Sequence, residues 1–181
     1  MNGFSNHALL GVGGSIAAYR TPDLAAQLRH SGFEVRTILS RAAEQFVTKT
    51  SIASMSRGEV FTAADGLTDV WHPTHIELAD WADIALIAPA TAVTIGRLAC
   101  GIAEGLLAET FLALRPEVHK FIAPAMNGNM LHQPAVQRNL NQLQEDGFTI
   151  IAPRVGELAC GYEGDGKIAQ ISDIISEITR S

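Results

Sequence analysis

The sequence has few charged residues, few cysteines and no long hydrophobic run, and each shortage excludes a class of protein. Charged residues make up 18% of the 181 positions, the formal net charge is −6, and lysine or arginine never forms a run, so nucleic-acid binding is not expected. The longest apolar runs are about six residues, against roughly 20 for a membrane span, and the first residues lack a secretory signal pattern. We therefore expect a cytoplasmic protein that binds neither nucleic acid nor membrane.

Only two cysteines are present, Cys100 and Cys160. A cytoplasmic setting favours free thiols, and neither cysteine has the spacing of a metal ligand. We expect no metal site, and we expect any functional cysteine to act as a thiol. Apolar residues make up 47% of the chain, which predicts a well-buried core or a subunit interface.

Short apolar runs alternate with segments of helical periodicity along the chain. Strands are expected over 7–12, 33–39, 83–89, 119–124 and 148–153, and helices over 15–32, 75–82, 133–147 and 171–180. One or two short helices are expected over 40–58, and a helical region over 91–114 is expected to break near Gly101. This alternation predicts a single α/β domain, residues 1–181, with a doubly wound parallel sheet covered on both faces.

Three of the expected strands end in the same tripeptide, Ile-Ala-Pro, at 87–89, 122–124 and 151–153. Proline lacks the backbone donor that a central strand needs, so each copy is expected to mark a carboxyl end. Ligands of open α/β sheets bind outside these ends. The following segments are therefore expected to form a ligand site with the first glycine loop, although any single copy could be a plain strand exit.

The first glycine loop, which contains Gly14 and Ser15, precedes a helix and could bind an anion such as phosphate. It is neither a GxGxxG fingerprint nor a P-loop, so dinucleotides and nucleoside triphosphates are not indicated. The alternative is a glycine-rich turn capped by Ser15. Ser40 follows the second strand and could add a second hydroxyl to the same anion.

His75 and Cys160 are candidates for chemistry. His75 precedes an amphipathic helix and could be a general base, although a structural or solvated histidine is the alternative. Cys160 lies among glycines that let the backbone approach a ligand closely, although an oxidisable bystander is the alternative. Cys100 is expected in the core. No neighbouring motif supports a role for the other histidines, at positions 7, 30, 72, 119 and 132.

The sequence resembles the flavin-containing cysteine decarboxylases, most closely the phosphopantothenoylcysteine decarboxylases of coenzyme A biosynthesis. The segments that carry the resemblance are GSIAAY, HIELADWAD, PATAVTIGRLACGIAEGLL, PAMNGNM and LACGYEGDGK, which have the family's order and spacing between residues 7 and 178. The resemblance implies a flavodoxin-like (Rossmann-like) fold, bound FMN, and a homotrimer or dodecamer with active sites at subunit interfaces.

The resemblance also implies roles for individual residues. Asn127 matches the residue that holds the substrate carboxylate, which an amide can do by donating hydrogen bonds. His75 matches the catalytic histidine, and Cys160 matches the cysteine that donates a proton in the last step. Met126 and Met130 are expected near flavin or substrate, or in the core. The implied FMN contacts are Gly14, Ser15, Ile16, Ser40, Ala42, Thr91, Ala92, Val93, Thr94 and Ala125.

The implied reaction is the FMN-dependent decarboxylation of an acylated cysteine, 4'-phosphopantothenoylcysteine. The alternative is the oxidative decarboxylation of a C-terminal peptidyl-cysteine; those relatives generally lack the cysteine matched by Cys160. Two positions depart from the family pattern and leave both substrates open: Val93 stands where the family usually has asparagine or aspartate, and Glu104-Gly105 replaces its usual Asn-Asp or Asp-Asn. A non-catalytic regulatory flavoprotein is less favoured, since its long acidic extensions do not occur here. Bacterial relatives usually carry a fused synthetase domain. We expect either that this activity lies on another polypeptide here or that the enzyme serves another pathway.

Overall fold

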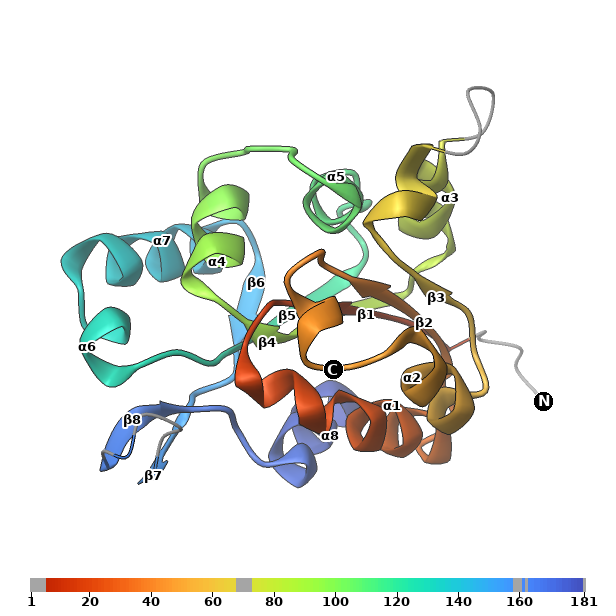
Figure 1. Ribbon diagram of the computed structural model, residues 1–181. Helices are drawn as coiled ribbons and strands as arrows, with labels where there is room; N and C mark the ends of the chain where they lie inside the picture. The colour runs from red at the N-terminus through yellow and green to blue at the C-terminus, as the bar shows by residue number, and fades with distance from the viewer. Residues whose placement is uncertain (1–5, 68–72, 158–160, 162, 181) are drawn as a thin grey trace.

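A six-stranded parallel sheet forms the centre of the protein in a computed structural model, which describes residues 6–67, 73–157, 161 and 163–180 (Figure 1). The strand order is β3-β2-β1-β4-β5-β6. Without the two-residue edge strand β3, this is the order of flavodoxin-like sheets. The strands are β1 (His7–Val12), β2 (Glu34–Leu39), β3 (Val60–Phe61), β4 (Ile84–Ala90), β5 (His119–Pro124) and β6 (Phe148–Ile150).

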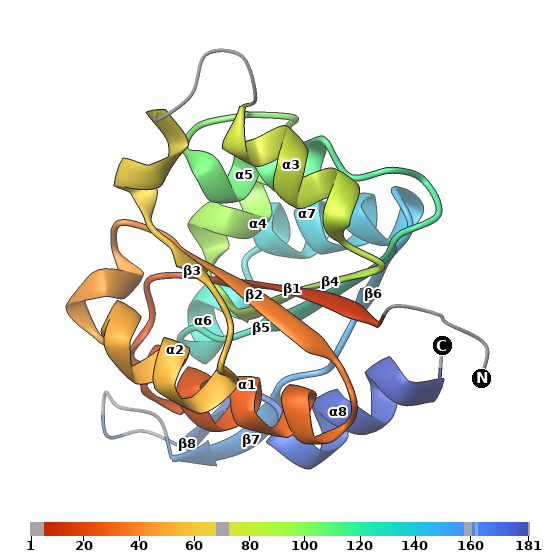
Figure 2. The same cartoon turned by 90° about the vertical axis from the view of Figure 1, so that its right-hand side faces the viewer.

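Helices cover both faces of the sheet, as Figures 1 and 2 show. The elements α1 (Thr21–His30), α2 (Lys49–Ser56) and α8 (Ile171–Arg180) lie on one face. The elements α3 (Thr74–Trp81), α4 (Ala92–Ala99), α5 (Leu106–Leu112) and α7 (Pro134–Glu145) lie on the other. The one-turn helix α6 (Gly128–Leu131) and the short 3-10 helices η1 (Ile16–Arg20), η2 (Ala43–Gln45) and η3 (Ala63–Leu67) lie in connections.

The strands are hydrophobic on both faces because each face meets a helical layer. Successive residues of a strand point to opposite faces, so Leu10 of β1 packs into the core under α1 and α8, whereas Leu9 packs into the core under α3, α5 and α7. In β4, Leu86 and Ile87 divide in the same way. This two-sided burial explains why the strands are continuous apolar runs rather than alternating patterns.

The topological switch point of the sheet lies between β1 and β4, because the chain leaves β1 for β2 on one side and reaches β4 on the other. Ligands of open α/β sheets bind at such a point, outside the carboxyl ends of the strands. In Figure 2 the strands run across the view with their carboxyl ends toward the left. The residues that follow β1 and β4 at this edge are Gly13 and Thr91.

The expected elements are confirmed apart from three details. The first helix begins as η1, and the three Ile-Ala-Pro segments do not all end a strand. Strand β5 ends at Pro124, but β6 ends at Ile150, and β4 continues past Pro89 to Ala90. Strand β4 tolerates the proline because its pairing with β5 is irregular between Ile87 and Ala90.

The third difference is the glycine-rich segment after β6, for which no strand was expected. Two of its parts pair as an antiparallel hairpin, β7 (Arg154–Glu157) and β8 (Glu163–Lys167). Neither strand has apolar alternation, so the usual sequence signal for a strand is missing. In the part of the chain that the structure describes, no helix is long and apolar enough to cross a membrane.

Candidate functional site

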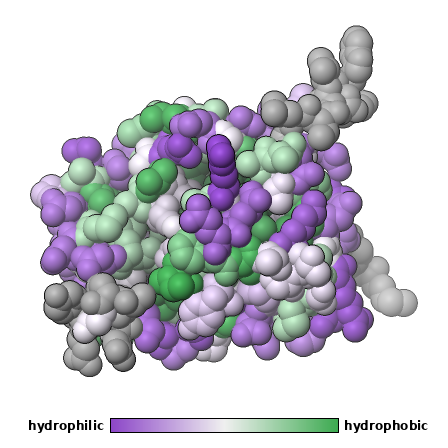
Figure 3. Space-filling model, viewed as in Figure 1, coloured by the Kyte–Doolittle hydropathy of each residue, from purple (hydrophilic) through white to green (hydrophobic). Residues whose placement is uncertain are grey.

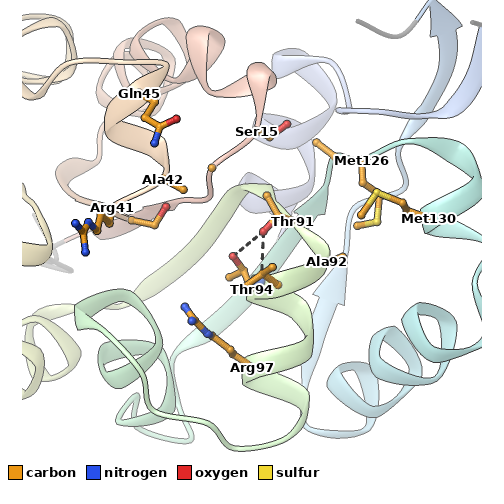
Figure 4. Close-up of a pocket in the computed structure, with 14 residues that line it drawn as sticks. Ser15, Arg41, Ala42, Gln45, Thr91, Ala92, Thr94, Arg97, Met126 and Met130 are labelled. Atoms are coloured by element: carbon orange, nitrogen blue, oxygen red, sulfur yellow. Dashed lines mark hydrogen bonds between the residues drawn. The ribbon is translucent and has the colours of Figure 1, made fainter. Parts of the chain in front are cut away.

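A cavity of about 660 Å³, here called the large cavity, opens at the carboxyl ends of β1, β2, β4 and β5 (Figure 4). Its volume lies within the range of small-molecule and cofactor sites. It lies beside the switch point of the sheet, where the topology predicts a ligand. The lining residues are Gly14, Ser15, Ser40, Arg41, Ala42, Gln45, Thr91, Ala92, Val93, Thr94, Arg97, Ala125, Met126 and Met130. Every predicted cofactor residue except Ile16 is in this set.

The loops after β1 and β2 approach each other closely at one wall of the large cavity. A Cβ atom added to Gly14 would lie 2.3 Å from the Cβ of Ala42, so only glycine allows this contact. Gly13 is fixed by a 2.9 Å hydrogen bond from its N–H to the carbonyl of Pro89 in β4. The glycine loop therefore connects the ends of three strands.

The hydroxyl groups of this wall also cap helical segments. The Ser15 side chain caps η1 by accepting a 3.3 Å hydrogen bond from the N–H of Ala17. Ser40 Oγ accepts from the N–H of Ala43, 3.2 Å away. Each hydroxyl still has a proton to donate while its oxygen accepts. The capping interpretation of Ser15 is thus confirmed, and it is compatible with ligand binding.

The segment after β4 forms a second wall. Thr91 caps α4 by accepting from the N–H of Thr94, and the two hydroxyl groups are 3.1 Å apart. Val93 is 62% exposed, a high value for an aliphatic side chain, and it faces the large cavity. An apolar contact surface occupies the position where the resemblance led us to expect a polar residue.

Three polar lining residues, Arg41, Gln45 and Arg97, were missed by the sequence analysis. In Figure 4, Arg41 and Gln45 lie opposite Met126 and Met130, which gives the large cavity a polar side and an apolar side. Their positions offered some signal: Arg41 directly follows Ser40, and Arg97 lies one helical turn after Thr94.

Arg97 also borders a second cavity of about 280 Å³, here called the small cavity. The two cavities share Ser40, Arg41, Thr94 and Arg97 as walls. Arg97 Nη2 lies 2.7 Å from Glu104 Oε2, and Glu104 also lines the small cavity. This ion pair joins α4 to the loop before α5 where the cavities meet.

The turn after β5 brings Ala125, Met126 and Met130 to the large cavity, as the resemblance implied. Asn127 caps α6, and its Oδ1 accepts a 2.9 Å hydrogen bond from the N–H of Asn129. Asn127 is half-buried and is not among the lining residues. A backbone reason for this asparagine therefore exists beside the predicted substrate contact.

His75 is the second residue of α3, and it is not among the residues that line the large cavity of its own chain. Its Nδ1 lies 3.9 Å from Glu109 Oε2 of α5, and both side chains are about one third exposed. The structure therefore does not bring His75 together with the predicted cofactor residues within one chain. The other predicted catalytic residue, Cys160, lies outside the described residues. Cys100, which was expected in the core, is exposed.

Asp65 of η3 fixes the segment that precedes α3. Burial tends to raise the pKa of its carboxyl group, but hydrogen bonds from the Thr62 N–H and hydroxyl and the nearby Lys49 ammonium outweigh burial and lower the pKa overall. The Asp65 carbonyl accepts a 3.0 Å hydrogen bond from the hydroxyl of Thr74, the residue before His75. Asp65 thus supports the start of α3.

The sheet order and the large cavity define a flavodoxin-like α/β protein with a cofactor-sized site at the switch point. The family model described as "Flavoprotein" matches residues 3–181, and the chain belongs to this family.

Relatives from two bacteria match most of the chain. The coenzyme A biosynthesis bifunctional protein CoaBC of Bacillus subtilis is 41% identical over 171 residues, which cover 94% of this chain and 42% of that protein. The probable phosphopantothenoylcysteine decarboxylase of Streptococcus mutans is 40% identical over 170 residues, which cover 94% of this chain and 95% of that protein. The chain thus spans under half the length of the bifunctional relative and nearly all of the other.

Solved structures show the same fold. A PPC decarboxylase mutant complexed with pantothenoylaminoethenethiol superposes with a TM-score of 0.90 at 32% identity and covers 97% of each chain. The FMN binding protein AtHal3 gives 0.87 at 33% identity and covers 97% of this chain and 96% of that one. The FMN-dependent cysteine decarboxylase SpaF gives 0.80 at 33% identity and covers 94% of this chain and 93% of that one.

Proposed function

We propose that this protein is an FMN-dependent decarboxylase of an acylated cysteine, and that its substrate is 4'-phosphopantothenoylcysteine in cytoplasmic coenzyme A biosynthesis. The observation that carries the proposal is the large cavity, because it gathers nine of the ten residues that the resemblance assigns to FMN. The Streptococcus mutans relative, which this chain matches over nearly its whole length, supports the choice of substrate.

The residues of the large cavity fit a flavin mononucleotide. The hydroxyl groups of Ser15 and Ser40 can donate to phosphate oxygens, and both lie beside the close contact of Gly14 with Ala42. Ala92, Val93, Ala125 and Met126 supply an apolar wall for a planar ring. When bound, FMN supplies hydride transfer from the carbon that bears sulfur, which allows carbon dioxide to leave.

Asn127 is proposed to hold the substrate carboxylate. Its amide oxygen faces the N–H of Asn129, which fixes the orientation of the side chain and turns its NH₂ group the other way. An NH₂ group can donate to a carboxylate oxygen, and this interaction orients the carboxylate before the carbon–carbon bond breaks. Asn127 directly follows Met126, a lining residue of the large cavity.

His75 is proposed to serve as the acid–base residue for the large cavity of another copy of the chain. It does not line the large cavity of its own chain. Exposed apolar side chains offer a contact surface for another copy: Ile16 is 52% exposed, Val93 62% and Met130 48%. Figure 3 shows hydrophobic side chains exposed between hydrophilic ones on this side of the molecule. A homotrimer, alone or within a dodecamer, would supply the second copy. Cys160 is proposed to donate the proton that completes the pantetheine product.

The experiment is an incubation of the FMN-loaded protein with phosphopantothenoylcysteine, and in parallel with a peptide that ends in cysteine. We expect loss of carbon dioxide from the first compound and formation of 4'-phosphopantetheine, measured by mass spectrometry. A protein that cannot be loaded with FMN, or a loaded protein that leaves both compounds intact, would contradict the proposal.

The second candidate is oxidative decarboxylation of a peptidyl-cysteine. Two observations favour it: SpaF matches at 33% identity, and the exposed Val93 makes one cavity wall less polar than the coenzyme A enzymes led us to expect. In the same experiment, conversion of the peptide alone, to a product that has lost carbon dioxide and two hydrogen atoms, would select this function.

A further inference from the structure

The hairpin of β7 and β8 packs against the turn that carries Met126 and Asn127. The N–H of Met126 donates a 3.0 Å hydrogen bond to the carbonyl of Gly166 in β8. A Cβ atom added to Gly166 would lie 1.7 Å from the Met126 carbonyl oxygen, so the two backbones are in direct contact. Strand β8 thus forms one support of the turn.

Asp165, the neighbouring residue of β8, contacts both ends of α6. Its Oδ2 pairs with Nε2 of His132, the residue that directly follows α6. Its Oδ1 lies 2.7 Å from the position that a Cβ atom would take on Gly128, the first residue of α6. A single carboxylate therefore spans the whole helix, from its first residue to the residue after its last.

Helix α6 needs such support because it has only four residues. Forming a first helical turn fixes three residues for one hydrogen bond, so an isolated turn of this length is unstable in water. Its internal bonds run from Leu131 N–H to the Asn127 carbonyl and from His132 N–H to the Gly128 carbonyl. The position of Asn127 at the start of the helix depends on this turn remaining closed.

We propose that Asp165 is a positioning residue of the candidate site: its contacts with His132 and Gly128 hold α6 closed, and thereby fix Asn127 and Met126. The catalytic consequence rests on the function proposed above, whereas the effect on α6 does not. The side chains of Asp165 and His132 are 38% and 63% exposed, so the pair adds little to global stability. Its role is local, because a small displacement of a substrate-binding group has a large effect on rate.

The test combines amide hydrogen exchange with steady-state kinetics on the full-length, FMN-loaded protein. Asp165→Ala and His132→Ala each remove the pair, whereas His132→Gln keeps a donor near the position of Nε2. Gly128→Ala is an independent perturbation, because its methyl group would lie 2.7 Å from Asp165 Oδ1 and displace the carboxylate while both partners of the pair remain. The control is Glu177→Ala, which removes a similarly exposed ion pair with Arg180 on α8.

We expect about tenfold faster exchange of the Met126, Leu131 and His132 amides in each of the variants Asp165→Ala, His132→Ala and Gly128→Ala. This acceleration corresponds to a tenfold increase in the equilibrium constant for opening of α6. With the substrate proposed above, kcat/KM should fall by about the same factor, mainly through KM. FMN content and the melting temperature should stay within error. His132→Gln should recover most of the loss, the double variant Asp165→Ala/His132→Ala should be no worse than either single variant, and Glu177→Ala should change neither reading.

Unchanged exchange of these amides in Asp165→Ala would overturn the proposal, as would fully additive effects of Asp165→Ala and His132→Ala. A loss of FMN or of several degrees in melting temperature in all three disruptive variants would show a purely structural role and would also overturn it. If the wild type decarboxylates nothing, the proposed function fails, and the exchange data alone decide the role of Asp165.

Discussion

Replacing Gly14 by alanine tests whether the contact between the first two loops shapes the cofactor site. The new Cβ would lie 2.3 Å from the Cβ of Ala42, and 3.0 and 3.1 Å from the Ala42 carbonyl carbon and Cα. Ordinary contact begins near 3.4 Å, so the loops must separate by roughly 1 Å. Such overpacking costs about 1–3 kcal/mol. If FMN requires the closed arrangement, its affinity falls by about five- to 150-fold.

The measurement is a fluorescence titration of apoprotein with FMN, together with a thermal melt. Gly96→Ala is the matched control because Gly96 lies inside α4, and its added Cβ would lie 3.5 Å from Asn139 Nδ2, an ordinary contact. The control should bind FMN as the wild type does and should gain up to about 1 kcal/mol of stability from helix propensity. An FMN affinity of Gly14→Ala equal to that of the wild type would refute the assignment of this loop.

Three further predictions concern residues away from the glycine loop. His75→Asn and Asn127→Asp should each abolish carbon dioxide release but keep FMN. An oligomer that contains both variant chains should recover part of the activity, and the absence of any recovery would refute a site shared between copies. Cys160→Ala should still release carbon dioxide but accumulate the ene-thiol, which mass spectrometry would detect; formation of the complete pantetheine product would contradict the role of Cys160. The pKa of Asp65 is lower in the folded protein than its unfolded value of 3.8, so the ionised carboxylate stabilises the fold above pH 3.8, and this contribution is lost as the pH falls through the folded pKa. The destabilisation by Asp65→Asn, measured by urea unfolding, should therefore be large at neutral pH and vanish in acid. Equal destabilisation at both pH values would contradict this.

Five of the six strands of the sheet were predictable from the sequence because each lies in a largely apolar segment. The edge strand β3 was not, since its two residues are too few to show a pattern. The edge of the sheet that holds the site followed from the order of strands and helices. The β7 and β8 hairpin was not predictable, since residues 154–157 and 163–167 lack the alternation that identifies strands. Backbone pairing and contact with the 125–128 turn stabilise it instead, and neither leaves a pattern in the chain.

The candidate site was predictable where residues act through the backbone or a strand end, as Gly14, Thr91 and Ala125 do. It was not predictable where two distant segments meet. Asp165 and His132 are 33 positions apart, and no local motif connects them. His75 illustrates a different limit: it does not line the large cavity of its own chain, and the role proposed for it requires a second copy, which one chain does not show.

The departure at Glu104-Gly105 has a local explanation that leaves the large cavity intact. Gly105 has φ 86° and ψ 153°, a conformation that is essentially restricted to glycine, so the asparagine or aspartate usual in the family would not fit this loop. Glu104 pairs with Arg97 instead of facing solvent alone. Both residues line the small cavity and neither lines the large one. A difference in substrate between this protein and the coenzyme A enzymes would therefore arise at one of two places: at Val93 in the wall of the large cavity, or in the small cavity, where the loop between α4 and α5 has its own conformation and charge.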